Sequence, residues 1–114
     1  MINHVDFSGL YDVADGDEDF LVSVLMVIEK NLNEFPNQLQ THLDENDTVA
    51  FAKKAHKLKS STAYLKHKDL ETLLLFMEDG NGVEITVLQD KLDTFQQVVK
   101  VILDDVQQKI DELG

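Results

Sequence analysis

The residues best suited to chemistry lie in positions 53–68, a stretch with six lysines, two histidines and no acidic residue. Because helical residues advance by about 100° each, His56 would lie roughly 140° from the centre of its helix's apolar stripe and face solvent. Its helical neighbours are Ala52, Lys53, Lys59, Ser60 and Ala63. An accessible imidazole beside an ammonium group suits a side chain that accepts and then holds a phosphoryl anion.

Helical periodicity dominates the chain around this stretch. We predict helices at residues 7–14, 18–43, 48–66, 69–78 and 85–113. The third carries the apolar stripe Phe51, Ala55, Leu58, Thr62 and Leu65, with Asp47 as its N-cap. In the second helix, Pro36 should bend the helix or split it.

Short connections make sequential helices antiparallel neighbours. The expected fold is therefore all-α, an up-down antiparallel four-helix bundle with an additional short N-terminal helix. Residues 1–114 should form a single domain, which suits their number. Because one bundle uses the apolar stripes, we expect a monomer.

The net charge of −12 argues against nucleic acid and membrane surfaces as partners. No apolar run approaches the roughly 20 residues of a membrane helix, and the acidic N-terminal stretch does not resemble a signal peptide. The chain has no cysteine, which fits a reducing compartment. We expect a cytoplasmic protein.

Residues 55–65 read A-H-K-L-K-S-S-T-A-Y-L. This run resembles the signature A-H-x-L-K-G-S-(S/A)-x-x-L-G of histidine-containing phosphotransfer (HPt) domains. The following L-x-x-L-x-x-x-M-E resembles the next helix of that family, and length and helix order agree over the whole chain. The resemblance implies that His56 is the phosphoacceptor and that Lys59 lies beside the phosphoryl group. Ser60 and Lys66 depart from the family pattern, which has glycine at both positions.

The hydroxymethyl group of Ser60 would either slow docking or donate a hydrogen bond to the ring or the phosphoryl group. Lys66 would alter only how its helix ends. A protein partner that docks at His56 would contact the exposed residues around it. For this docking surface we name Ala52, Lys53, Lys57, Ser60, Ala63 and Tyr64.

The resemblance implies a role in a multistep two-component phosphorelay. His56 would take a phosphoryl group from the aspartate of a response-regulator receiver domain and pass it to another receiver. The partners would be such receivers and a hybrid sensor histidine kinase, and the receiver would supply the metal ion. The chain itself would be a relay rather than an enzyme, with no cofactor and no metal site of its own.

The alternative is a non-catalytic helical adaptor that binds an acidic partner through the basic residues 53–68. A histidine kinase core fits less well, because Lys57 and Ser61 stand where such kinases carry an acid and a proline. We see no carboxylate–histidine spacing that would support a hydrolase. We assign no function to the other histidines: His4 would lie in a frayed end, His42 near a helix end, and His67 at the C-terminus of the third helix, where a cation is favourable.

Overall fold

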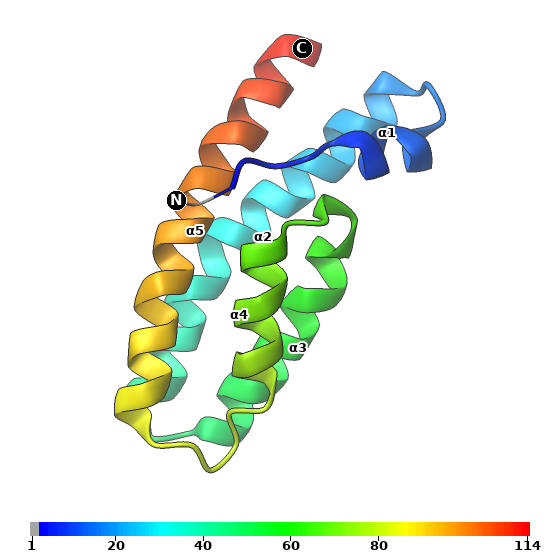
Figure 1. Cartoon of the computed structure of the whole chain (residues 1–114). Coiled ribbons are helices and arrows are strands. Elements are labelled where there is room, and N and C mark those ends of the chain that lie inside the picture. The colour runs from blue at the N-terminus through cyan, green and yellow to red at the C-terminus, as the bar shows by residue number, and fades with distance from the viewer. Residues whose placement is uncertain (1–2) are drawn as a thin grey trace.

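The computed structural model describes residues 3–114, and its regular structure is helical (Figure 1). The elements are α1 (Ser8–Ala14), α2 (Glu18–Asp44), α3 (Thr48–Thr62), the 3-10 turn η1 (Ala63–Leu65), α4 (Lys68–Glu78) and α5 (Ile85–Leu113). No strand occurs in residues 3–114. The prediction of an all-α fold is confirmed.

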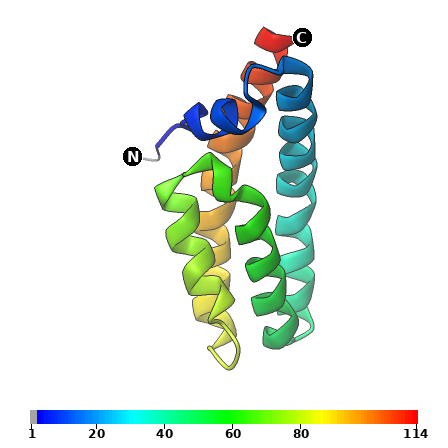
Figure 2. The ribbon, with the colours of Figure 1, turned by 90° about the vertical axis from the view of Figure 1, so that its right-hand side faces the viewer.

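The four longer helices pack side by side. Helix α2 contacts α3 and α5, and α4 contacts the same two helices. Helices α2 and α5 have 27 and 29 residues, against 15 and 11 for α3 and α4. They therefore extend past the shorter pair at one end, where α1 lies across the molecule and contacts α2 and η1 (Figures 1 and 2).

The predicted apolar stripes form the core. All five stripe residues of the third predicted helix are buried, including Thr62, whose hydroxyl donates to the carbonyl of Leu58 at 2.9 Å. On α2 the buried stripe is Leu21, Leu25, Ile28, Leu32, Phe35 and Leu39. Burial of one face of α3 leaves its opposite face, which carries His56, at the surface.

Pro36 does not split α2. The helix runs without interruption from Glu18 to Asp44 although proline removes the N–H that would bond the carbonyl of Leu32. Leu32, Phe35 and Leu39 are all buried around this position. Packing of these side chains therefore holds both halves of α2 in one helix, and the split that we considered is wrong.

Helix α3 ends earlier than predicted, at Thr62 rather than residue 66. The hydroxyls of Ser61 and Thr62 both donate to the carbonyl of Leu58, at 3.0 and 2.9 Å. Such side-chain bonds compete with the backbone bonds that extend an α-helix. The chain then tightens into η1 and turns at Lys66, whose φ is +49°.

The left-handed backbone of Lys66 gives this position a physical preference for glycine. A residue with a Cβ is destabilised by about 1–2 kcal/mol in this conformation. Replacing it by glycine removes this cost, but the greater freedom of glycine in the unfolded chain offsets part of the gain in stability. We expect Lys66→Gly to raise the free energy of unfolding by about 0.5–1 kcal/mol. Urea unfolding followed by circular dichroism measures this change.

The matched control is Lys66→Ala, which keeps the strained backbone. It also removes the side chain that packs on α1, where Cε of Lys66 would lie 3.2 Å from a Cβ built on Gly9. We expect the alanine variant to be no more stable than the wild type. A glycine variant less stable than the wild type would show that the contact with α1 outweighs the backbone strain.

His67 does not lie at the C-terminus of α3, as we expected, but is the N-cap of α4. Its Nδ1 accepts the N–H of Leu70 at 3.2 Å, and its Nε2 lies 2.6 Å from the carbonyl oxygen of Asn3. A carbonyl only accepts, so Nε2 carries the proton and Nδ1 does not. The ring is buried, with 2% exposed.

His4 likewise does not lie in a frayed end. Its Nδ1 is 3.0 Å from the carboxylate of Asp105, which also accepts the backbone N–H of Val5 at 2.9 Å. The backbone N–H of Asn3 donates to Asp69 at 3.1 Å. Residues 3–5 are thus tied to both α4 and α5.

None of the helices in residues 3–114 has the length and apolarity needed to cross a membrane.

Candidate functional site

His56 lies on the exposed face of α3, as predicted. Asp47 is the N-cap of this helix, as predicted, and its side chain accepts the N–H of Ala50 at 2.9 Å. Ala55 and Leu58, on either side of His56, are fully buried, whereas 67% of the His56 side chain is exposed. The core thus fixes the rotation of α3, and this rotation presents the imidazole to solvent.

The last residue of α4, Glu78, joins His56 and Lys59 in one cluster. Its Oε2 lies 2.6 Å from Nζ of Lys59, and its Oε1 lies 3.7 Å from Nδ1 of His56. The first contact is a close ion pair, and the second distance is longer than a hydrogen bond. The Glu78 side chain is only 18% exposed, so its carboxylate forms the inner wall of the cluster.

The Glu78 carboxylate is held in its ionised form. The close contact with the Lys59 ammonium group is the largest cause that lowers the pKa of Glu78 from its ordinary value; partial burial opposes this shift, and nearby His56 adds to it. A carboxylate beside Nδ1 favours a proton on that nitrogen. In a neutral ring with its proton on Nδ1, the electron pair of Nε2 is free.

The pH dependence of stability should report this ion pair. Because folding lowers the pKa of Glu78, its ion pair with Lys59 stabilises the fold above the ordinary value of 4.5 and is lost as the pH falls through the lower folded value. We expect the free energy of unfolding of the wild type to exceed that of Glu78→Gln at pH 8. The excess should shrink below about pH 4.5.

Urea unfolding of both proteins at a series of pH values measures the difference. Glu34→Gln on α2 is the control, because Glu34 is exposed and no lysine or histidine nitrogen lies within 4 Å of its carboxylate in residues 3–114. A difference for Glu78→Gln that grows towards acid would have the wrong sign for a lowered pKa.

The residues predicted for docking mostly lie at the surface around His56. Exposed members of the set are Lys53, Lys57, Ser60, Ala63 and Tyr64, the last of them in η1 and 53% exposed. Ala52 differs, since it is 8% exposed and offers little surface to a partner. The lysines of residues 53–68 do not all have the same surroundings: Nζ of Lys54 lies 5.3 Å from the centre of the Phe35 ring. Lys54 therefore contributes to packing between α3 and α2.

Our sequence reasoning assigned no role to Glu78, although it lies in the run that resembles the next helix of the HPt family. A signal was present: α4 must return antiparallel to α3 after a short connection, which brings an acid at its end level with His56. The sequence spacing did not reveal the pair formed by His56 and Glu78, because its two residues lie on different helices. No group of three or more histidine or acidic side chains in residues 3–114 is placed to hold a metal ion.

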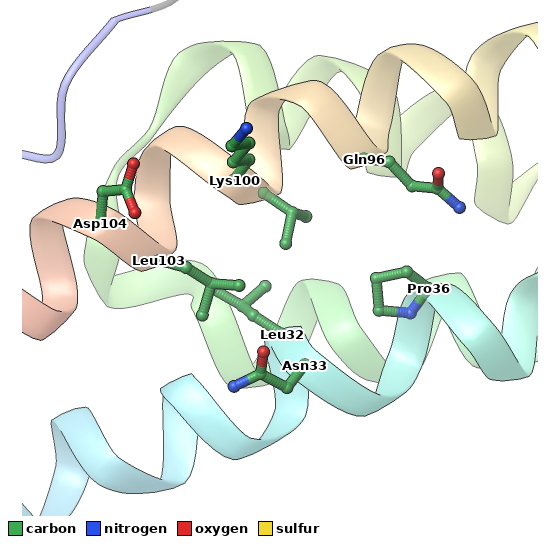
Figure 3. Close-up of a pocket in the computed structure, with 8 residues that line it drawn as sticks. Leu32, Asn33, Pro36, Gln96, Lys100, Leu103 and Asp104 are labelled. Atoms are coloured by element: carbon green, nitrogen blue, oxygen red, sulfur yellow. The ribbon is translucent and has the colours of Figure 1, made fainter.

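A hollow lies between α2 and α5, away from His56, Lys59 and Glu78 (Figure 3). Leu32 and Pro36 line it from α2, and Leu103 lines it from α5. The charged ends of Lys100 and Asp104 point away from the gap between the two helices (Figure 3). This hollow is an apolar packing feature beside Pro36, and it shares no residue with the cluster around His56.

Comparisons of the chain with models of known protein families, with curated proteins and with solved structures find no match.

Proposed function

We propose that the protein is a histidine phosphotransfer protein of a multistep phosphorelay, and that its helices form an up-down antiparallel four-helix bundle with α1 added at one end. The packing of α2 against α3 and α5, and of α4 against the same helices, supports the bundle. The observation that carries the function is the cluster of an exposed His56 with Lys59 and Glu78. The resemblance of residues 55–65 to the HPt signature agrees with it.

The proposed reaction needs no proton transfer. The Nε2 electron pair of His56 attacks the phosphorus of a receiver aspartyl phosphate, so an N–P bond forms while the P–O bond to the aspartate breaks. The aspartate leaves as a carboxylate, and the proton on Nδ1 stays on the ring. The ring gains positive charge in this step, and the carboxylate of Glu78 near Nδ1 stabilises it.

Lys59 would move towards the incoming phosphoryl group. Its ammonium group is bound to Glu78 in the free protein, and a phosphoryl anion on His56 would compete with Glu78 for it. Transition states of phosphoryl transfer need mainly positioning and charge neutralisation. The receiver, with its own metal ion, would supply most of the catalysis, and this chain would act as the carrier.

The direct test is the intact mass of the chain after incubation with phosphorylated receiver domains. We expect a gain of about 80 Da, the mass of one phosphoryl group, which is lost in acid. Phosphoramidate, a small phosphoryl donor, should give the same gain without a partner. A folded protein that gains no mass from phosphoramidate or from any receiver of a broad panel would reject the relay in favour of the adaptor.

A further inference from the structure

A groove lies along the seam between α3 and α4, next to the proposed phosphoacceptor. Lys59 lines it from α3, Ala63 lines it from η1, and Glu71 and Leu75 line it from α4. Its volume is about 250 Å³, below the roughly 300–1,000 Å³ of sites that enclose small molecules. The groove therefore suits one or two side chains of a protein partner better than a metabolite.

The groove is continuous with the cluster around His56. Lys59 belongs to both, because the same side chain lines the groove and binds Glu78. On α4, residues three and four apart share a face, so Glu71, Leu75 and Glu78 follow one another along the seam. A partner helix laid along this seam would contact Leu75 and Glu71 while it covers His56.

The residues that line the groove differ in chemistry. Leu75 is 52% exposed, and with Ala63 it offers an apolar surface. Glu71 is exposed, and within residues 3–114 no lysine or histidine nitrogen lies within 4 Å of its carboxylate. Lys59, the cation of the groove, is already bound by Glu78. The groove thus presents an apolar side chain next to an unpaired negative charge.

We propose that Leu75 and Glu71 determine which receivers the protein accepts, by binding a receiver helix that presents an apolar side chain and, one turn away, a lysine or arginine. The inference rests on the proposed function. The apolar side chain would fill the groove against Leu75, and the cation would pair with Glu71. The basic residues of α3 would contact a different, acidic part of the same receiver, so the surface has two polarities where the sequence indicated one.

Transfer kinetics from a phosphorylated receiver test the proposal. We expect Glu71→Lys to raise KM about tenfold, because it places like charges together, with kcat changed less than twofold. Leu75→Ala should also raise KM and leave kcat unchanged. The controls are Glu34→Lys and Val27→Ala on α2; Glu34 is exposed and Val27 is 58% exposed. Both controls should transfer like the wild type.

Rescue makes the test specific. A receiver whose docking lysine or arginine is replaced by glutamate should bind Glu71→Lys better than it binds the wild-type protein. Unchanged KM for both groove variants, or a fall in kcat alone, would overturn the assignment. Labelling by phosphoramidate distinguishes the relay function from the docking role of the groove, because a small donor needs no docking. Normal labelling with normal KM rejects only the groove, whereas failure of the wild type to be labelled by any donor rejects the relay itself.

Discussion

Replacing His56 by glutamine is expected to abolish phosphoryl uptake while the protein stays folded. Glutamine resembles histidine in size and polarity, but its amide nitrogen has no available electron pair with which to attack phosphorus. The His56 side chain is 67% exposed and lies outside the buried core, so the substitution removes no core packing. We expect no mass gain from a phosphorylated receiver or from phosphoramidate, and an unchanged unfolding midpoint in urea.

His42→Gln on α2 is the matched control. His42 is also a helical histidine, and in residues 3–114 no carboxylate lies within 4 Å of its ring. This variant should take up one phosphoryl group as the wild type does. If His56→Gln gains the same mass as the wild type, another residue is the acceptor. If the adaptor alternative holds, His56→Gln and the wild type should bind their partner equally well.

Most of the fold was predictable because it depends on local patterns. The alternation of three and four residues between apolar side chains identified the buried faces of α2 and α3, and residues of these stripes are buried throughout. The end of α3 was mispredicted, since the periodicity continues to Leu65 while the hydroxyls of Ser61 and Thr62 take up the carbonyl of Leu58. Apolar spacing carries no information about such hydrogen bonds.

The exposure of the candidate site was also predictable, but its chemistry was only partly so. The angle of His56 from the core stripe follows from the sequence of α3 alone. The carboxylate beside it comes from α4, and the pairing of Lys59 with Glu78 depends on how the two helices pack. His67 shows the same limit, because its contacts with Asn3 and Leu70 are formed only in the folded chain.

Replacing Lys59 by alanine is expected to slow phosphoryl transfer by about 10- to 100-fold. A hydrogen bond to a charged group is worth about 1.5–3 kcal/mol, and each 1.4 kcal/mol is a factor of ten in rate. The variant also leaves the Glu78 carboxylate without its cation beside His56, so that carboxylate would repel the incoming phosphoryl anion. Rapid-quench measurement of single-turnover transfer from a phosphorylated receiver gives the rate directly.

Two variants separate the role of Lys59 from the general effect of positive charge. Lys57→Ala removes a neighbouring exposed lysine for which no ion pair exists in residues 3–114, and should reduce the rate far less. Lys59→Arg keeps the charge and should retain most of the activity. If Lys57→Ala and Lys59→Ala lose the same fraction of the transfer rate, Lys59 acts only as one of several positive charges that attract the receiver. A loss confined to Lys59→Ala, and present at saturating receiver, would place its ammonium group against the phosphoryl group during transfer.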